Sequence, residues 1–330
     1  MDLVPCGAVR GKPPYPLAAR VCPPVLVIVA AIVASTAAGV WAEHRYGGRA
    51  GLAARRSMLV VLYVLLPPAI FFNLARADID LNAGLGIAFG LLALILVSAC
   101  AWTIGSRALG LGRPTVGAVV TSTLVANTGY LGYPTVAAVI GFDALGEAAA
   151  YDILVSAPAL LLGAFAVGAA FGGRAGEGVR ERTVAFFTRN PPLYAAVVAL
   201  LAPDALAPDV LVDVSRAIIV AILPLGFFAV GAALAEEADE GRIGFPPPID
   251  ATVAGVVALR LVAAPALLWL ISLPFIDLPD TYLLLAAMPC GLNTMVVAHA
   301  YGLDVRVAAG AIAWSTAIAV GGLTVGALVA

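Results

Sequence analysis

The stretch VANTGYLGYP, residues 125–134, places polar and helix-breaking residues inside an apolar segment. It lies in a run from Pro114 to Phe142 that contains no charged residue. An apolar run of about 20 residues or more is typical of a helix that crosses a membrane. A break in such a helix frees backbone N–H and C=O groups, which cost several kcal/mol each if they stay unpaired. The stretch therefore predicts a broken helix that is sheltered by protein or lines a water-filled cavity.

The composition of the whole chain is that of a membrane protein. Hydrophobic residues make up 62% of the 330 residues and charged residues only 12%, and the mean hydropathy is +1.03. A soluble domain is usually about half apolar and about a quarter charged. The net charge of −2 comes without a basic cluster, so we expect lipid, and no nucleic acid, around this chain.

The inventory of reactive residues argues against an enzyme. The chain has two histidines, His44 and His299, which nearly excludes Ser-His-Asp chemistry and a histidine-rich metal centre. The four cysteines show no metal-binding spacing. Cys6 and Cys22 would pair only on an oxidising face, and we favour small apolar fillers for all four. We expect no cofactor, no metal and no catalytic residue, while coupling to H⁺ or Na⁺ stays open.

Ten segments are long and apolar enough to cross a bilayer. The sixth is the weakest, because its charge-free core, Asn190 to Pro203, spans only 14 residues. The ten segments are 22–42, 57–76, 81–105, 115–141, 149–172, 188–207, 215–235, 251–273, 281–302 and 306–329.

The distribution of arginine and lysine predicts the orientation. Twelve of these residues fall in the odd-numbered connections, which join segments 1 and 2, 3 and 4, 5 and 6, 7 and 8, and 9 and 10. Five fall on the opposite side, if the amino-terminal tail is included. Cytoplasmic loops carry the excess of positive charge, so we expect a multi-pass protein of the cytoplasmic membrane with both termini outside. We expect residues 1–21 to form a tail. The two halves would be residues 22–172 and 190–330, joined by a cytoplasmic linker at residues 173–189. Residues 236–250 would be a solvated connector.

Three motifs recur in the same order in the two halves. A Pro-Pro pair opens the first and sixth segments, and LLPPAIFF in the second resembles ILPLGFF in the seventh. The break in the fourth segment is matched by MPCGLNT, residues 288–294, in the ninth, so that Asn127 and Asn293 lie 166 residues apart. Five segments per half is an odd number, so the second half enters the membrane from the opposite side. This pattern predicts an all-α polytopic protein built as a 5+5 inverted-topology repeat.

The two breaks contain the residue types that a binding site in a membrane needs. Prolines disfavour helix before them and glycines permit a sharp turn or a close approach, and the helix ends that follow carry positive dipoles that favour an anion. The alternative is a pair of ordinary kinked helices with packing glycines and threonines. The candidate substrate-binding residues are Asn127, Thr128, Gly129, Asn293 and Thr294, and the residues expected to shape the crossing are Pro134, Pro289, Gly132 and Gly291.

NTGYLGYP in the fourth segment and PCGLN in the ninth resemble the auxin efflux carrier family, including its prokaryotic malate-permease-like members. LLPPAIFFNLA, RNPPLYAAVVALL, LRLVAAPALL and HAYGLD are also similar, so the resemblance runs from about residue 24 to the end. It implies ten transmembrane helices in a 5+5 inverted repeat like that of the bile-acid symporters. Broken helices 4 and 9 would cross at the substrate site, at Asn127 and Asn293. Helices 1, 2, 6 and 7 would form a scaffold, often a homodimer, against which the other six move.

Two charged residues inside the segments are further candidates, because ionisable groups in a membrane are often functional. Arg260 either attracts an anionic substrate or answers a carboxylate, or it snorkels to the cytoplasmic surface. Asp152 is either a protonatable coupling group or an interfacial carboxylate, and we favour the second interpretation. Neither break contains a carboxylate of its own. We also expect Asn73 to be a packing residue, His299 to be interfacial, and Asp213 and Arg216 to form a solvated pair.

These observations favour a secondary transporter for a small organic anion, a carboxylate, that works by elevator-like alternating access. The closest alternative is a sodium- or proton-coupled antiporter or symporter of similar fold for a solute that is not a carboxylate. An intramembrane enzyme lacks the required side chains, and a receptor lacks a soluble output domain. The expected partners are the organic anion, the lipid bilayer and a second copy of the chain.

Overall fold

The computed structural model describes residues 23–77, 81–173, 191–241, 243–244 and 246–329, together with Arg180 and Val184. Within these residues the secondary structure is helical, and the extended backbone is limited to one isolated antiparallel bridge. Seven uninterrupted helical segments there are long and apolar enough to span a membrane. The expected all-helical, multi-pass character is thus confirmed. The seven segments are Leu26–Tyr46, Gly48–Leu74, Leu81–Ala108, Phe142–Phe171, Asp209–Asp239, Ala251–Ser272 and Val305–Gly326.

The first half of the chain contains long helices with several π-helical turns. Such turns widen a helix locally and are frequent at functional sites. In chain order the elements are α1 (Pro23–Tyr46), α2 (Gly48–Val60), η1 (Val61–Leu65), α3 (Leu66–Leu74), α4 (Leu81–Thr103), η2 (Ile104–Ala108), α5 (Arg113–Leu124), η3 (Thr128–Gly132), α6 (Tyr133–Val139), η4 (Phe142–Ala144), α7 (Leu145–Tyr151), η5 (Asp152–Ser156), η6 (Ala159–Ala164) and α8 (Phe165–Phe171).

The second half repeats the pattern of long helices with one broken segment. Its elements are α10 (Pro191–Leu201), η7 (Asp204–Leu206), α11 (Asp209–Asp239), α12 (Ala251–Ala258), η8 (Leu259–Ala263), α13 (Ala264–Ser272), α14 (Asp280–Ala286), α15 (Asn293–Tyr301) and α16 (Val305–Val329).

The fourth and ninth expected segments are both interrupted. Helix α5 ends at Leu124 and helical structure resumes at Thr128, whereas α14 ends at Ala286 and α15 begins at Asn293. The sixth expected segment is short as well, because α10 has 11 residues. These three segments are the ones missing from the seven uninterrupted spans. The helix ends at Leu124 and Ala286 confirm that the backbone is interrupted near the two asparagines.

Two expected connectors are helical in the structure. Arg49, Arg55 and Arg56 were expected in a loop but lie on α2, because Gly47 makes the turn alone with a φ of 55°. Helix α11 likewise continues to Asp239, into the expected connector 236–250. Arginine, alanine and glutamate all favour helix, so these helices continue beyond their apolar segments. The expected tail 1–21, with Cys6 and Cys22, and most of the linker 173–189 lie outside the described residues.

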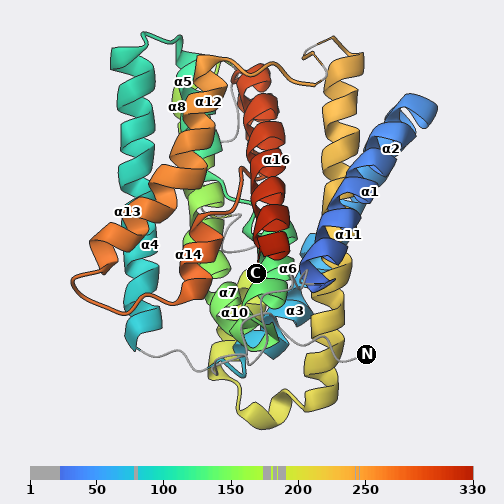
Figure 1. Ribbon diagram of the computed structural model, residues 1–330, viewed down its shortest axis with the longest axis vertical. Helices are drawn as coiled ribbons and strands as arrows, with labels where there is room; N and C mark the ends of the chain where they lie inside the picture. Colours follow the sequence, from blue (N-terminus) through green and yellow to red (C-terminus); the bar gives the residue numbers. More distant parts are fainter. Residues whose placement is uncertain are drawn as a thin grey trace.

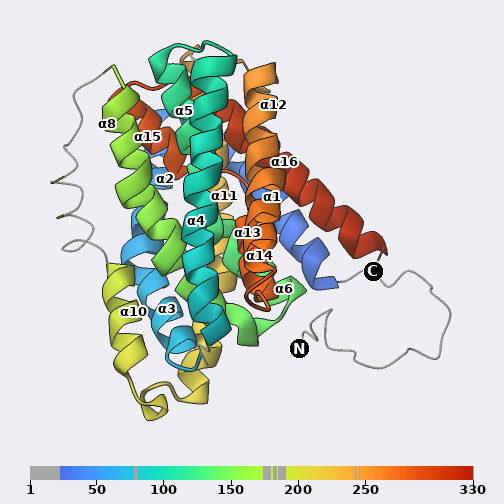
Figure 2. The same ribbon diagram turned by 90° about the vertical axis from the view of Figure 1, so that its left-hand side faces the viewer.

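The helices pack as two groups. Helices α1, α2, α3, α10 and α11 pack chiefly against one another, and the remaining helices form the second group around α4, α5, α12 and α16. Figure 1 shows α1, α2 and α11 on one side of the molecule and α4 and α13 on the other. Figure 2 shows α3 and α10 together at one end of the first group.

Glycines bring the backbones of α1 and α11 into direct contact. A Cβ on Gly39 would lie 2.2 Å from the carbonyl oxygen of Phe228, and one on Gly231 would lie 2.1 Å from that of Thr36. Small residues at such crossings let helices approach closely, which is a main source of packing energy between helices in a membrane. The first group is therefore held together by an interface that tolerates no added side-chain atom.

Candidate functional site

The two helix breaks hydrogen-bond to each other. The N–H of Asn127 donates to the carbonyl of Pro289 over 2.8 Å, and the N–H of Gly291 donates to the carbonyl of Val125 over 2.9 Å. These bonds form an antiparallel bridge between Ala126 and Cys290. Each break thus satisfies backbone groups that the other frees, which removes most of the cost of interrupting a helix in lipid.

Gly291 is required by this crossing. A Cβ at Gly291 would stand 3.0 Å from the carbonyl oxygen of Ala126, an atom of the facing backbone that cannot rotate away. The N–H of Cys290 donates to the hydroxyl of Ser315 on α16 over 3.0 Å. The second break is therefore fixed both by the first break and by α16.

Arg260 fastens the crossing from behind. Its side chain is 1% exposed, and the guanidinium donates to three carbonyls: Met288 at 2.9 Å, Thr123 at 3.1 Å and Ala286 at 2.6 Å. These carbonyls belong to the carboxyl ends of α5 and α14, where the helix dipole is negative. A planar guanidinium can serve several acceptors at once, which an ammonium on a flexible stem does less well.

The structure contradicts two of the expectations for Arg260. It neither meets a carboxylate nor snorkels to the membrane surface, because its three hydrogen bonds hold it in the interior. A buried cation needs partners that offset its desolvation, and the carbonyls exposed by two helix ends at one place provide them. Arg260 is a positioning residue for the crossing.

A cavity of about 600 Å³ lies on the open side of the crossing. It separates the two helix groups: α2, η1 and the first residues of α3 and α10 line one wall, and the crossing, η5 and η6 line the other. Most lining side chains are apolar, and a few polar groups converge on the crossing, which is the usual character of a small-molecule site. Four of the expected substrate-binding residues line this cavity: Asn127, Thr128, Gly129 and Asn293.

The polar groups of the crossing differ in how they are satisfied. Asn127 is only 4% exposed, and its side-chain Oδ1 has no hydrogen-bond partner in the described part of the chain. Asn293 is half-buried and begins α15. Thr294, also expected at the site, is fully buried and does not line the cavity. A buried polar atom without a partner costs about 1–3 kcal/mol, so Asn127 Oδ1 is an acceptor that an O–H or N–H donor of a ligand would satisfy.

Asp152 lies in the same cavity. It is half-buried at the start of η5, accepts a hydrogen bond from the hydroxyl of Thr128, and accepts one from the hydroxyl of Tyr133 over 3.3 Å. The favoured interpretation of Asp152 as an interfacial carboxylate was wrong, because Asp152 contacts Thr128 at the first break. The signal was present in the sequence as a lone acid within an apolar segment. Its distance from the break along the chain concealed the contact.

Pro134 and Gly132 do not form the break. The extended residues are Val125 to Asn127, and the π-helical η3 already leads into Pro134 at the start of α6. A proline is tolerated in the first turn of a helix, and a π turn relieves its clash with the preceding carbonyl. Gly132 instead makes room for a neighbour, since a Cβ there would lie 2.7 Å from Leu285. Pro289 does lie in the second break, where its carbonyl is a bridge acceptor.

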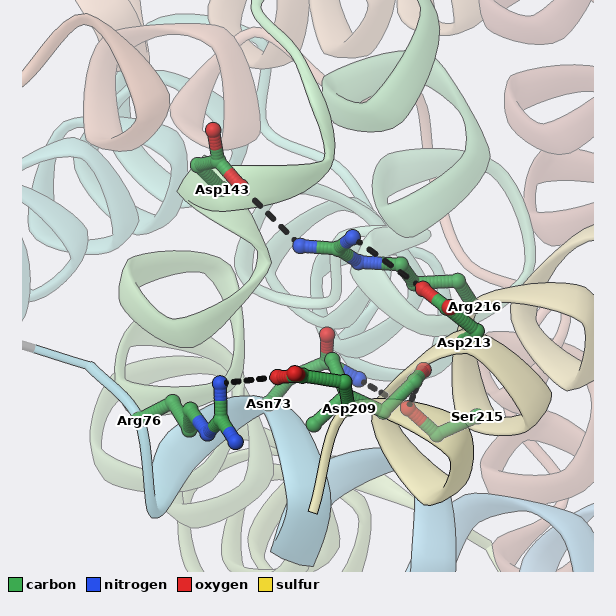
Figure 3. Close-up of polar contacts among 8 residues, drawn as sticks. Asn73, Arg76, Asp143, Asp209, Asp213, Ser215 and Arg216 are labelled. Atoms are coloured by element: carbon green, nitrogen blue, oxygen red, sulfur yellow. Dashed lines mark hydrogen bonds and ion pairs between the residues drawn. The ribbon is translucent and has the colours of Figure 1, made fainter. Parts of the chain in front are cut away.

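The opposite end of the molecule carries a cluster of ion pairs (Figure 3). Arg216 on α11 contacts Asp143 on η4 at 2.9 Å and Asp213 at 3.5 Å, and Arg76 contacts Asp209 at 2.6 Å. The expected solvated pair is thus part of a larger group, which also lines a second cavity of about 360 Å³.

Asn73 underlies this cluster. Its side-chain amide donates to the hydroxyl of Ser215 over 2.9 Å and to the carbonyl of Ala69 over 2.7 Å. Asn73 is 6% exposed, and it joins α3 to α11 as the packing residue that the sequence suggested. At the other end of α11, His299 meets the buried Glu237 at 2.9 Å, so it is more than an interfacial side chain.

Comparison with known proteins agrees with this architecture. The profile of the family described as "Membrane transport protein" matches residues 185–325, which include the second break. An uncharacterized transporter of Methanocaldococcus jannaschii is 22% identical over 269 residues, covering 77% of this chain and 82% of the relative. The protein is therefore a membrane transport protein. The profile match and this relative support a transporter of the auxin efflux carrier family, as its motifs predicted.

Proposed function

We propose that the protein is a secondary carrier that moves a small organic anion, a carboxylate, by alternating access. The observation that carries the proposal is the cavity at the crossing of two broken helices, with one amide from each break on its wall. Broken helices at matching positions of two halves mark the binding site in transporters built from inverted repeats.

The proposed architecture has ten membrane segments in a 5+5 inverted repeat. Three features support it: seven uninterrupted spans, two segments broken at matching motifs, and the short α10. The antiparallel bridge between the breaks is the arrangement that an inverted pair of segments would make where they meet. The carrier would lie in the cell membrane with both termini outside, in the orientation that the arginine distribution favours.

The chemistry of the cavity suits a carboxylate. The side-chain amides of Asn127 and Asn293 offer N–H donors, and the first turns of η3 and α15 begin at the cavity, where the helix dipole is positive. Arg260 occupies the opposite, negative ends of α5 and α14 with its charge. Those ends therefore repel an anion less than they otherwise would.

The two helix groups provide the moving parts. The cavity lies between them, and its lining runs from the crossing to Arg55 on α2 and Pro192 at the start of α10, toward the odd-numbered connections. We propose that the group with α1, α3, α10 and α11 is the scaffold, forms the homodimer, and stays fixed while the other group moves elevator-like. At the opposite end the Arg216–Asp143 pair joins the two groups.

Ligand-induced thermal stabilisation of the purified protein in detergent tests the site and substrate class together. We expect malate, succinate or another small carboxylate to raise the unfolding temperature, since a ligand at about 100 times its Kd adds about 2.7 kcal/mol. The variants Asn127→Ala and Asn293→Ala should lose the shift. Asn82→Ala, on α4 and away from the cavity lining, is the matched control. If only Na⁺ or pH shifts the native protein, the alternative holds: an ion-coupled carrier for a solute that is not a carboxylate.

A further inference from the structure

We propose that Asp152 is the coupling site of this carrier and binds one proton for each substrate molecule. The proposal rests on the proposed function, because it assigns the coupling ion of the same site. Its starting observation is that a carboxylate side chain and both crossing asparagines line one cavity.

Asp152 has no cationic partner in the described part of the chain. The side chain of Arg55, which also lines the cavity, contacts Glu236 at 3.4 Å, and Arg260 is engaged by three carbonyls. Elements α4, α7, α10, η3 and η6 pack against η5. The titratable groups that they and the adjoining α6 carry are acidic or neutral: Cys100, Tyr130, Tyr133, Glu147, Tyr151 and Tyr194.

An anion entering this cavity would therefore meet a second negative charge, whose described partners are the neutral hydroxyls of Thr128 and Tyr133. Two like charges in one poorly hydrated space disfavour the state in which both are ionised. Binding of a carboxylate must then favour protonation of Asp152, and by thermodynamic reciprocity protonation must favour the carboxylate by the same factor.

A proton fits the surroundings of Asp152 better than a metal ion. The Asp152 oxygens already accept hydrogen bonds from the hydroxyls of Thr128 and Tyr133, whereas Na⁺ would need several free oxygen ligands. A proton needs only the carboxylate.

The hydrogen bond from Thr128 supplies a route from the proton to the substrate. Thr128 opens η3 and directly follows Asn127. The ionised Asp152 accepts from this hydroxyl, whereas a protonated carboxyl has one oxygen turned into a donor. Protonation of Asp152 thus changes the hydrogen bond that orients Thr128, the residue that follows the proposed substrate-binding Asn127.

The test uses the full chain in proteoliposomes, with ¹⁴C-labelled malate and succinate as probes. Counterflow at equal pH measures substrate exchange, and uptake under an acid-outside gradient, with the membrane potential clamped, measures proton coupling. One proton per substrate gives about tenfold accumulation per pH unit, because a factor of ten in proton activity is the free energy of one pH unit. We expect Asp152→Asn to lose pH-driven accumulation and the pH dependence of counterflow, while the control Glu147→Gln keeps both and Asp152→Glu keeps accumulation.

Each outcome separates this proposal from the proposed function. Counterflow in the native protein without accumulation under the pH gradient overturns proton coupling and leaves the carrier intact, and a response to a Na⁺ gradient in its place assigns the other ion. Accumulation that persists in Asp152→Asn overturns the role of Asp152. Absence of counterflow for every carboxylate in the native protein overturns the proposed function itself. If Asp152→Asn does not fold, pH-driven accumulation by Asp152→Glu and proton uptake reported by internal pyranine decide the question.

A different observation carries a second proposal: we infer that the Arg216–Asp143 pair is a latch that keeps the cavity closed at the end opposite Arg55. This pair joins α11 in one helix group to η4 in the other, with a contact of 2.9 Å. The guanidinium also lies 5.5 Å from the ring centre of Phe142 on η4. Because η4 follows α6 and hence the crossing, opening this end must separate Arg216 from Asp143.

The neighbouring pairs identify the control. Arg216 with Asp213 and Arg76 with Asp209 join elements of one group only, so they do not resist movement between the groups. Asp143 in the latch is fully exposed and 29% of the Arg216 side chain is exposed. Ion pairs that water can reach are weak, which suits a contact that must open in every transport cycle.

The latch is tested by labelling a cavity cysteine from each side of the membrane. In a chain otherwise free of cysteine, Ala157→Cys lies on the cavity wall. A membrane-impermeant maleimide applied to the Arg216 side should label it slowly, and Asp143→Asn should accelerate that labelling several-fold, whereas Asp213→Asn should not. Equal rates in all three proteins, or acceleration by Asp213→Asn alone, would overturn the latch.

Discussion

The cavity at the crossing and the ion-pair cluster around Arg216 use charge in opposite ways. Toward the odd-numbered connections, the cavity holds one carboxylate, Asp152, whose described partners are two hydroxyls. At the other end, Arg216 and Arg76 are matched by three aspartates. A paired cluster suits a closed contact between moving parts. An unpaired charge beside an apolar cavity suits a group that changes its protonation state or meets a ligand.

Depth is the second difference between these regions. Arg260 is buried behind the crossing, whereas the cluster of Arg216 and Arg76 is exposed to solvent. A buried charge that loses a partner costs several kcal/mol, and an exposed pair contributes about 0–1 kcal/mol. The comparison can therefore be tested on one scale, the free energy of unfolding.

The largest loss should come from Arg260→Ala. This change leaves the carbonyls of Thr123, Ala286 and Met288 without their guanidinium donor, and each buried acceptor left unpaired costs about 1–3 kcal/mol. We expect a destabilisation of about 3–5 kcal/mol, measured as a lower unfolding temperature in detergent. Arg260→Lys should recover part of it, because an ammonium keeps the charge and reaches fewer carbonyls. Stability equal to the native protein would show that the crossing stands without Arg260.

The crossing glycines give the next largest effect. Gly291→Ala would push a Cβ to within 3.0 Å of the Ala126 carbonyl, while at Gly129 nothing lies within 4 Å. Forcing an atom into a packed contact typically costs about 1–3 kcal/mol. We expect Gly291→Ala to lower both stability and transport, and Gly129→Ala to leave stability nearly unchanged. Equal behaviour of the two variants would contradict the close contact between the breaks.

These variants also mark how far the sequence could predict the structure. The breaks at Asn127 and Asn293 were predictable, because proline, glycine and amides in an apolar run leave few alternatives. Asp152 and Arg260 were assigned wrongly, although both were noticed. Their roles depend on partners from other segments, and a helical pattern gives depth along one helix but not which neighbour faces it. The position of Pro134 was misread for a related reason, since a π turn can absorb a proline that would break a regular helix.

A smaller effect is expected at Asn73, beneath the ion-pair cluster. Asn73→Ala removes the hydrogen bond to Ser215 and leaves that hydroxyl with its bond to the carbonyl of Val212. Because Ser215 retains this partner, we expect a loss of about 1 kcal/mol, within the usual range for one buried hydrogen bond. The double variant with Ser215→Ala measures the coupling between the two side chains. Full additivity would show that the bond between α3 and α11 contributes nothing.

The smallest effect should come from Arg76→Ala, which removes an exposed ion pair within one helix group. Arg76 and Asp209 have side chains that are 40% and 84% exposed, so water and salt screen their attraction. We expect a change of at most about 0.5 kcal/mol in the free energy of unfolding, vanishing at high salt, and no faster labelling of the cavity from the Arg76 side. Asp143→Asn should be equally mild in stability, yet it should accelerate that labelling, because Asp143 joins the two groups and Asp209 does not. If Arg76→Ala opened the cavity as well, the closing function would belong to the whole cluster, and the distinction between pairs within and between helix groups would fail.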